Sequence, residues 1–518
     1  MTNSYQRGLN RRTFLRYGGV ATVTFALPGL VTACGGGDSA SSASGLLRVA
    51  QADAVSTLDP QKQGSMIDMS VLSNVFDFLT RRDDNGKLVG GLAEKWTAVN
   101  DTTWRFTLRK GVKFHNGEPF DAAAAKFSLE RLLDPATKSP IVELKFVTGV
   151  KLVDDATIEV KTKTPDPLIP AKVSLFGGVM VPPKYIEEKG DDHFAQNPVG
   201  TGAFKFVSFE RDSEVALESN NDYYLGAPKI KELQFRPIPN PSTAMSSLQA
   251  GEIEMVTGVT SDATQQVKGD DSIEIVTYPG LRSFYLSLDT LSGGPLAKKE
   301  VRQALNYAVN VPQLIDTVLG GAAQQIATII PPQNFGFDPS VQPYEHDPDK
   351  AAGLLAKAGY PDGFSTQLTG QNSDGPIVEA IAGQLRDAGI DIEVKLLDPG
   401  TYETGLLSDN SKELGPMFYV GNTAWTMDAS NNVQSYVKSD RRQSRWNNKR
   451  ADQLVTIEET NVDPAARKKA FAELQSLMKE EAPFVYLYAV DNLYAMKSDV
   501  SWPGNDIGLL RMDSAAIG

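Results

Sequence analysis

The sequence contains one cysteine and three histidines in 518 residues, and this scarcity excludes several kinds of chemistry. A single thiol permits neither an internal disulfide nor a thiolate cage for a metal ion. The histidines, His115, His193 and His346, are too scattered for a zinc site or a histidine-based nucleophile relay. A Gly-x-Ser-x-Gly elbow, which would indicate a serine hydrolase, is also missing. These absences favour binding over catalysis, and we expect no cofactor and no metal.

Positive charge is in deficit as well, with 51 Lys and Arg residues against 64 Asp and Glu residues and a formal net charge of −13. A nucleic-acid partner is disfavoured, because a phosphate backbone attracts basic surfaces. Hydrophobic residues make up 41% and charged residues 22%, which is typical of a globular chain and excludes both a disordered chain and a polytopic membrane protein. At ~150 residues per domain, the length predicts roughly three domain-sized units.

The N-terminal segment has the features of an export signal. It carries several arginines and no acid, and its apolar stretch 17–33 is too short and too glycine-rich for a stable membrane span. The pair Arg11-Arg12 precedes a polar residue, an aromatic residue and a leucine, and this segment is similar to the twin-arginine export signal. We therefore expect residues 1–33 to be a signal peptide.

The only cysteine, Cys34, ends this apolar stretch. Val31-Thr32-Ala33-Cys34 resembles a bacterial lipobox, in which the cysteine receives lipid, and residues 34–45 then form a Gly/Ser-rich tether. The alternative is a buried cysteine beside a core helix. The lipoprotein interpretation predicts a protein outside the cytoplasm, anchored at the cell membrane through lipid and periplasmic if the cell is Gram-negative.

Alternating apolar residues predict a small antiparallel unit in the first half of the chain. The segment 104–109 has the period of a half-buried strand, with a turn at Gly111. A helix over 121–133 and two strands around the turn Asp154-Asp155 follow. Gly200-Thr201-Gly202 lacks the remaining residues of a nucleotide-binding loop, so we interpret it as a tight turn.

From about residue 296, helices alternate with short strands. Asp347-Pro348 gives an N-cap followed by proline at the first helical position, and Gly359 ends that helix. Three more elements are predicted: a strand at 364–369, a helix at 376–388 and a strand at 390–396. This order argues for an α/β lobe. A charged helix over 463–481, which we expect to be an exposed face, has the same Asp-Pro start.

The apolar segment 484–488 is followed by only about 30 residues, too few for a domain. It must therefore pair with an earlier strand. The simplest arrangement has the chain leave a first lobe near residue 285, build a second lobe and return near residue 485. Two crossings make a hinge, and hinged lobes enclose a cleft.

Several segments, taken in order, resemble one known family: 58–60, 74–80, 91–96, 104–118, 198–205, 301–308 and 347–363. The most telling is the segment from Trp104 to Glu118, which looks like the signature of family 5 of the bacterial extracellular solute-binding proteins. These are the peptide and nickel binders of ABC importers. The similarity spans essentially all of residues 46–518.

The resemblance implies an α/β, two-lobed, periplasmic-binding-protein-like fold of type II, with three subdomains and a central ligand cleft. The expected parts are a lobe I core (46–73, 198–284 and 485–518), a small subdomain of lobe I (74–197) and lobe II (285–484). The family delivers solute unchanged to the permease subunits of an ABC importer, so we expect no enzyme activity. We also expect a monomer.

The strongest candidate for a binding segment is 421–432. In the family a comparable segment lines the cleft, and in peptide-binding members an aspartate there pairs with the α-ammonium of the ligand. Aligning Asp428-Ala429 with the family's Asp-Pro pair puts Trp425 where that acid usually stands. Either Asp428 substitutes for the acid, or this member does not recognise a free amino terminus.

Other candidates carry charge or aromatic surface. Trp425 is either a flat wall for a ligand or a core residue. Arg282, near the expected first crossing, can clamp a carboxylate or form a hinge ion pair. Arg445 is the best pocket candidate of the basic cluster 441–446. The expected ligand-binding set is completed by Phe284, Tyr419 and Asn422.

These features predict a lipid-anchored protein that captures an oligopeptide or a similar small polar solute by lobe closure and delivers it to the permease. One alternative is an exported hydrolase of peptides or glycans in which Asp428 does acid–base work. Another is a binder of a non-peptide solute such as an opine, an oligosaccharide or a metal chelate. A third is an accessory surface lipoprotein whose cleft serves a partner protein.

Overall fold

The computed structural model describes residues 45–505 and 507–518. The expected signal peptide, Arg11, Arg12, Cys34 and nearly all of the tether lie outside these residues. The described residues form one compact unit. None of the helices in the described part combines the length and the apolarity that a membrane span requires.

A seven-stranded sheet organises the N-terminal part of this unit, in the order β12-β19-β11-β1-β10-β9-β8. The central strand β1 runs parallel to both β10 and β11. Buried residues of β1, such as Leu47 and Val49, join the core cluster that also holds the helix α1 (Met66–Val75). The strands are β1 (Leu46–Gln51), β8 (Phe204–Glu210), β9 (Glu214–Ser219), β10 (Glu232–Pro237), β11 (Met255–Thr257), β12 (Ile273–Tyr278) and β19 (Asn492–Lys497).

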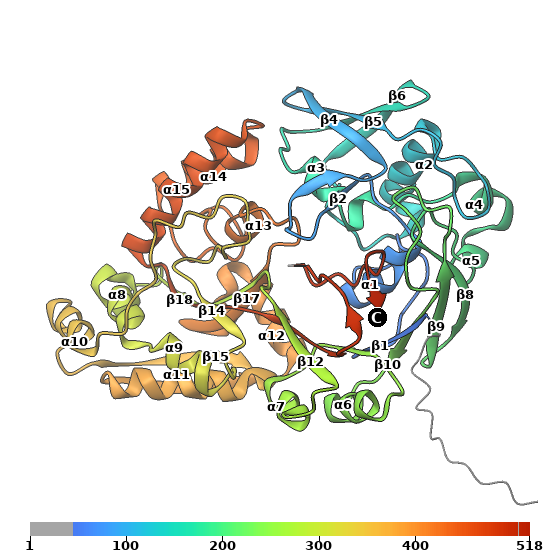
Figure 1. Cartoon of the computed structure of the whole chain (residues 1–518). Coiled ribbons are helices and arrows are strands. Elements are labelled where there is room, and N and C mark those ends of the chain that lie inside the picture. The colour runs from blue at the N-terminus through green and yellow to red at the C-terminus, as the bar shows by residue number, and fades with distance from the viewer. Residues whose placement is uncertain (1–44, 506) are drawn as a thin grey trace, which may run out of the picture. The chain divides into compact units, whose positions relative to one another are not determined.

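A six-stranded sheet organises the second part, in the order β14-β18-β13-β17-β15-β16. Neighbouring residues of β13 belong to two different core clusters: Leu286 shares one with buried residues of α8, α9, α10 and α11, and Tyr285 shares the other with buried residues of α12, α14 and α15. These helices are labelled in Figure 1. The strands are β13 (Arg282–Leu288), β14 (Ala323–Gln325), β15 (Phe364–Gln371), β16 (Ile390–Leu397), β17 (Met417–Thr423) and β18 (Phe484–Val490). The helices are α8 (Lys299–Ala308), α9 (Val311–Thr317), α10 (Pro348–Lys357), α11 (Gly375–Asp387), α12 (Pro399–Leu406), α14 (Lys449–Thr460) and α15 (Pro464–Glu481).

The small antiparallel unit expected in the first half is a four-stranded sheet in the order β4-β5-β7-β6. Its strands are β4 (Ala93–Asn100), β5 (Thr103–Leu108), β6 (Val147–Asp154) and β7 (Thr157–Thr162), and α2 (Ala122–Leu133) packs against β6 and β7. The glycines of the segment 200–202 form a close-packed turn, since a Cβ at Gly200 would lie 2.0 Å from the Val75 carbonyl oxygen.

The chain passes between the two large sheets at two points. It leaves the seven-stranded sheet after Tyr278 and enters the six-stranded sheet at Arg282, and it returns between Val490 and Asn492. The sequence analysis expected these crossings near residues 285 and 485. The segment 484–488 does pair with an earlier strand, β13, but it does so inside the six-stranded sheet. From here on, residues 282–490 are called the second lobe and the rest of the described chain the first lobe.

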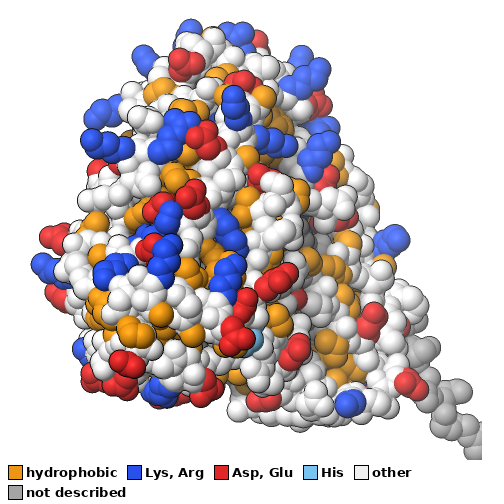
Figure 2. All heavy atoms as spheres, turned by 90° about the vertical axis from the view of Figure 1, so that its left-hand side faces the viewer, with side chains coloured by type: hydrophobic (Ala, Val, Ile, Leu, Met, Phe, Trp, Pro, Cys, Tyr) orange, Lys and Arg blue, Asp and Glu red, His pale blue; other side chains and the backbone are white. Residues whose placement is uncertain are grey.

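The local signals for the helices of the second lobe are confirmed. Asp347 and Asp463 cap α10 and α15 through their side chains, each with proline in the first turn. On the side of the molecule where α14, α15, α8 and α10 lie in Figure 1, basic, acidic and apolar side chains are intermixed (Figure 2). The helix α15 is nonetheless not only an exposed face, because its residues Arg467 and Phe471 are buried.

Candidate functional site

One edge of the six-stranded sheet gathers most of the predicted site residues. The strands β15, β16, β17 and β18 run in the same direction, and β13 runs opposite to them, so their carboxyl ends meet the amino end of β13. Ligands of open α/β sheets bind outside the carboxyl ends of the strands. Arg282, Phe284 and Asn422 lie on the last pairs of the ladder at this edge, and Trp425 lies in the loop that follows β17.

Aromatic stacking holds Arg282 at this edge. The ring of Phe284 stacks on Tyr419 with centroids 5.2 Å apart and planes 14° apart. The guanidinium carbon of Arg282 lies 4.9 Å from the centroid of the Phe284 ring. Below them, the hydroxyls of Tyr419 and Tyr488 form a hydrogen bond of 2.7 Å. The stack therefore presents a cation at the edge and continues into the core.

Gly421, which the sequence analysis did not single out, makes this stack possible. It pairs with Phe284 across β17 and β13. A Cβ at this position would lie 2.6 Å from Phe284 Cε1 and 2.7 Å from Arg282 Nε. Since real Cβ atoms do not approach other atoms so closely, any larger residue must displace both side chains.

Asp374 is a second residue that the sequence analysis missed. It ends the short 3-10 helix Asn372–Asp374 between β15 and α11, at the same carboxyl edge. Burial raises the pKa of its carboxyl, against the charge of Arg282, which lowers it. Its only sequence signal was its place just after a predicted strand.

Trp425 presents its side chain at the surface, with 39% of it exposed. The loop that carries it contacts the first lobe through Arg82 of β2 (Thr80–Arg82), which donates a hydrogen bond to the carbonyl oxygen of Thr426. Arg82 also donates to the Gly86 carbonyl at 2.7 Å. Burial lowers the pKa of Arg82 to about 10, against the charges of Asp428 and Asp83, which raise it.

Asp428 is buried and fully engaged within the second lobe. Arg467 donates to both of its carboxylate oxygens, at 2.9 and 2.7 Å. The backbone N–H of Ser430 donates to the same carboxylate at 3.0 Å. Asp428 thus stabilises the loop from inside, and its oxygens are not directed to solvent. Nothing in the sequence distinguishes Arg467 from the neighbouring cations of α15, because only the fold brings it to Asp428.

Glu458 of α14 lies beside this ion pair. Its carboxylate accepts a hydrogen bond from the Ser430 hydroxyl and lies 3.5 Å from Arg467 Nη2. Burial raises the pKa of Glu458 to about 8, with Asp428 adding to the rise, while Ser430 and Arg467 lower it. Burial and the neighbouring Asp428 thus both favour the protonated form of Glu458 beside Arg467.

Arg445 lies away from the other predicted residues. It is buried, its Nη2 lies 3.0 Å from Asp289 Oδ2, and its guanidinium packs on the ring of Phe418. Asp289 follows the end of β13 opposite to Arg282, so roughly 20 Å of strand separate Arg445 from the carboxyl edge.

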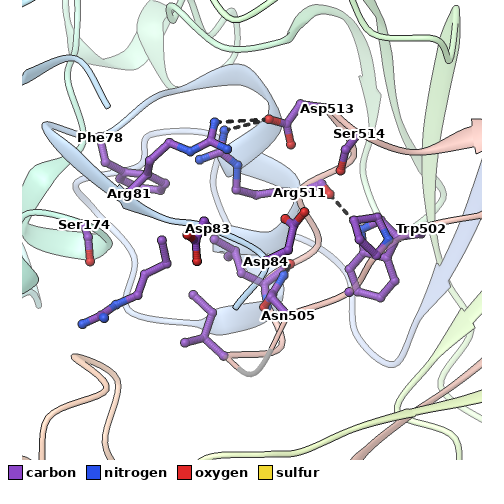
Figure 3. Close-up of a pocket in the computed structure, with 15 residues that line it drawn as sticks. Phe78, Arg81, Asp83, Asp84, Ser174, Trp502, Asn505, Arg511, Asp513 and Ser514 are labelled. Atoms are coloured by element: carbon purple, nitrogen blue, oxygen red, sulfur yellow. Dashed lines mark hydrogen bonds and ion pairs between the residues drawn. The ribbon is translucent and has the colours of Figure 1, made fainter. Parts of the chain in front are cut away.

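The first lobe contains a pocket of about 480 Å³ (Figure 3). Its lining includes Arg82, the residue that bonds the loop after β17. It lies between the segment 78–84, which includes Arg82, and the C-terminal segment 502–514. Arg81 and Arg511 both point to Asp513, at 3.5 and 3.3 Å, and Trp502 Nε1 donates to the Arg511 carbonyl at 2.8 Å. Arg511 Nη2 also lies 3.6 Å from Asp77 Oδ1, so these two arginines face two carboxylates.

The charged clusters of the site do not form a metal centre. Within residues 45–505 and 507–518, no three His, Cys, Asp or Glu side chains gather in a group that could hold a metal ion. His115 instead makes a bond that supports the fold: its Nε2 lies 3.0 Å from the Gly202 carbonyl oxygen, and burial lowers its pKa to about 4.

Comparison with known proteins identifies the family. Residues 87–444 match the model of "Bacterial extracellular solute-binding proteins, family 5 Middle". The glutathione-binding protein GsiB of Salmonella paratyphi A is 28% identical over 445 residues, which cover 83% of this chain and 86% of that protein.

Two solved structures place the fold. HbpA2 from Haemophilus parasuis matches with a TM-score of 0.84 at 22% identity, over 91% of this chain and 100% of that one. The periplasmic binding protein DppA from Helicobacter pylori, in complex with the peptide STSA, matches with a TM-score of 0.71 at 25% identity, over 91% and 98% of the two chains. The predicted α/β, two-lobed periplasmic-binding-protein fold is therefore confirmed. The chain belongs to family 5 of the bacterial extracellular solute-binding proteins and is a solute-binding protein of the ABC-importer type, not an enzyme.

Proposed function

We propose that this protein is a lipid-anchored receptor that captures a peptide, or a similar small polar solute, between its two lobes and delivers it to the permease of an ABC importer. Ligand contacts to both lobes stabilise the closed form, which the permease then recognises. The curated relative and the solved complex named above bind glutathione and a peptide, respectively. A peptide is thus the first ligand class to test.

The observation that carries the proposal is the carboxyl edge of the six-stranded sheet. There Trp425 exposes its ring, and Arg282 lies on Phe284 without an ion pair to any described carboxylate. An exposed aromatic surface and an unpaired cation at the same edge of a sheet are typical of a site for a polar ligand with an anionic group. Asn422, at the end of β17, lies on the opposite face of the strand and holds the loop through the Asn431 carbonyl, at 3.4 Å.

Tryptophan fluorescence tests the proposal directly. Titrating the protein with a pool of peptides of two to five residues should shift or quench the emission of Trp425, and Trp425→Phe should remove most of the change. Mass spectrometry of solute released from natively purified protein should identify an organic molecule with its covalent structure intact. Cleavage products, or no response to any pool of peptides, opines, oligosaccharides or metal chelates, would count against the proposal.

A non-peptide organic solute is the second candidate. It is favoured by Trp425, which stands where peptide-binding relatives carry the acid for a free amino terminus, while Asp428 is held by Arg467. Binding of an opine or an oligosaccharide more tightly than any peptide in the same titration would favour this candidate.

Export and anchoring are separate parts of the proposal. Cys34→Ser should move the protein from the membrane fraction to the soluble fraction outside the cytoplasm. Changing Arg11 and Arg12 together to Lys should trap the precursor inside the cell, because the twin-arginine route reads this pair. A protein that stays in the membrane fraction after Cys34→Ser would contradict the lipid anchor.

A further inference from the structure

We propose that Gly320 and Ser261 form a stop between the two lobes, which limits how far the lobes rotate apart at the candidate site. Gly320 belongs to the second lobe and Ser261 to the first. Both are positioning residues: they act on a ligand only through the angle at which the lobes rest before the ligand arrives. This inference goes beyond the proposed function, which states only that the lobes close.

The two residues approach each other more closely than two side chains could. A Cβ built on Gly320 would lie 1.7 Å from Ser261 Oγ and 2.7 Å from Ser261 Cβ. Turning the serine side chain moves its Oγ but leaves its Cβ in place. Since non-bonded carbon atoms need about 3.5–4.0 Å, a larger residue at position 320 must displace one side of the contact. Glycine at this position therefore brings the lobes into contact.

The contact lies directly beside the second chain crossing. Gly320 comes after α9 and before β14, whose residue Ala323 pairs with Val490 at the end of β18. The backbone N–H of Asp491, in the crossing itself, donates to the Ala322 carbonyl at 3.1 Å. The second-lobe side of the contact is therefore tied to the crossing by the backbone.

Ser261 is tied to the same crossing from the first lobe. It begins the short helix α7 (Ser261–Thr264), which follows β11. The strand β11 pairs with β19, the first strand after the crossing, and the backbone N–H of Val259 donates to the Leu493 carbonyl at 3.3 Å. Each side of the contact thus moves with its own lobe when the lobes rotate about the crossings.

The strand order puts this contact and the candidate site on opposite flanks of the crossings. The order is β14-β18-β13-β17, and the crossings connect to β18 and β13. Gly320 lies on the β14 flank, whereas Asn422 and Trp425 lie on the β17 flank. A rotation in the plane of this sheet that separates the lobes on the β17 flank presses them together on the β14 flank. The contact therefore stops the rotation that opens the site.

A groove beside the contact leaves room for the opposite rotation. Its walls come from both lobes and include Thr264 and Ile275 of the first lobe and Ala322 of the second. The lobes therefore do not pack against each other along the whole β14 flank. They can separate there when the site closes, as hinged lobes do when a few residues absorb the rotation.

Distances between spin labels in the ligand-free protein test the stop. The labels are attached to the exposed positions Asn85→Cys of the first lobe and Glu403→Cys of the second, in the soluble Cys34→Ser form of the whole mature chain. Double electron–electron resonance then measures the distance between them. Gly320→Ala should shorten this distance by about 4 Å relative to wild type.

The size of the shift follows from a lever. The new Cβ of Gly320→Ala needs about 1 Å more room than the 2.7 Å available to Ser261 Cβ. The contact lies about one strand spacing, or ~5 Å, from the crossing. Glu403 follows β16, which is four strands from β18, so its label lies roughly 20 Å away on the other flank. The displacement is therefore amplified about fourfold.

Matched variants separate the contact from backbone strain. Gly320 and Gly321 both have positive φ, +60° and +84°, so alanine strains the backbone at either position. Among the described residues, no atom outside its chain neighbours lies within 4 Å of a Cβ built on Gly321, so Gly321→Ala should keep the wild-type label distance. Combining Gly320→Ala with Ser261→Gly removes the opposing Cβ and should restore that distance. Ser261→Gly alone should lengthen it.

Several outcomes would overturn the inference: an unchanged or longer label distance in Gly320→Ala, an equal shift in Gly321→Ala, or a double variant that keeps the shift of Gly320→Ala. If Gly320→Ala does not fold, an unchanged distance in Ser261→Gly overturns it instead. The measurement uses no ligand, so the stop can be disproved while the proposed function stands. If the distances change as expected and no solute binds, the proposed function falls and the stop remains.

Discussion

Two charged clusters of the second lobe differ in how their charges are satisfied. In the loop behind Trp425, Arg467 holds Asp428 with two hydrogen bonds and also approaches Glu458, and all three side chains are buried. At the carboxyl edge of the sheet, the guanidinium of Arg282 instead lies over the ring of Phe284, and no described carboxylate forms an ion pair with it.

Burial and pairing together distinguish charges that stabilise the fold from charges that are available to a ligand. A buried charge must be paired within the protein, because removing it from water costs several kcal/mol. A charge at an edge can stay hydrated until a ligand arrives. We therefore assign the cluster of Asp428, Glu458 and Arg467 to the stability of the loop, and Arg282 remains our proposal for a charge that meets the ligand.

The largest expected effect follows from breaking the buried cluster. Arg467→Met leaves the Asp428 carboxylate buried without its cation and should lower the free energy of unfolding by about 3–5 kcal/mol. Urea unfolding at pH 7 measures this change. The control Arg450→Met removes an exposed ion pair with Glu473 between the same two helices, α14 and α15, and should cost less than about 1 kcal/mol. A similar loss in the free energy of unfolding for both variants would show that the buried cluster stabilises the protein no more than an exposed ion pair does.

The second effect depends on pH. The pKa of Glu458 is about 8 in the folded protein, above its value in the unfolded chain, so the folded state holds this proton more tightly. The resulting stability is fully present below about pH 4.5 and is lost as the pH rises through about 8. Glu458→Gln, which stays neutral, should flatten the decline in stability between pH 6 and 9, by an amount on the order of 1–3 kcal/mol.

Urea unfolding of wild type and Glu458→Gln across this pH range measures the effect of that proton. Glu473→Gln, an exposed residue of α15, serves as control and should keep the wild-type slope. If Glu458→Gln leaves the pH dependence of the free energy of unfolding unchanged, a group other than Glu458 binds the proton.

The third effect tests the residue that lies farthest from the edge. Arg445→Met should lower the free energy of unfolding by only about 1–2 kcal/mol, because Asp289 keeps hydrogen bonds from the backbone of Leu291 and from the backbone and hydroxyl of Ser292. Calorimetry should show unchanged ligand affinity. A weaker complex would instead connect Arg445 to the site.

The smallest effect on stability is expected at Trp425. Trp425→Ala changes an exposed side chain and should alter the free energy of unfolding by less than about 0.5 kcal/mol. Ligand affinity should fall about tenfold, or about 1.4 kcal/mol, through the lost aromatic surface. Paired melting and titration measurements check both numbers, and a large loss of stability would show that Trp425 is part of the core.

Local signals in the sequence predicted many elements of the fold. The Asp-Pro starts of α10 and α15 and the alternation along β5 depend on neighbouring residues only, so they can be recognised without the fold. The residues at which the chain passes between the two large sheets were harder to predict from the sequence. The polar start of β13 resembles a loop until its pairing with β17 and β18 is known.

The candidate site was predicted only in part, because some of its residues come together only in the folded chain. Trp425 stands in a segment that was compared with the cleft segment of a known family, whereas Arg282 was predicted from its place near the first crossing, and the sheet brings both to one edge. Asp374 was missed because it lies some 90 residues from Arg282 in the sequence. Arg445 and Arg282 are the same residue type and differ only in their surroundings. Arg445 forms an ion pair with Asp289, whereas Arg282 lies over the Phe284 ring without an ion pair to any described carboxylate.

By itself, the sequence determined the class of the molecule: a family of two-lobed binding proteins, with helices and strands whose starts and ends are set by local caps, turns and periodicity. Only the tertiary structure decided which charges are available to a ligand. Pairing depends on side chains that come from distant parts of the chain, such as Arg467 on Asp428, and no local pattern records where a distant partner will lie.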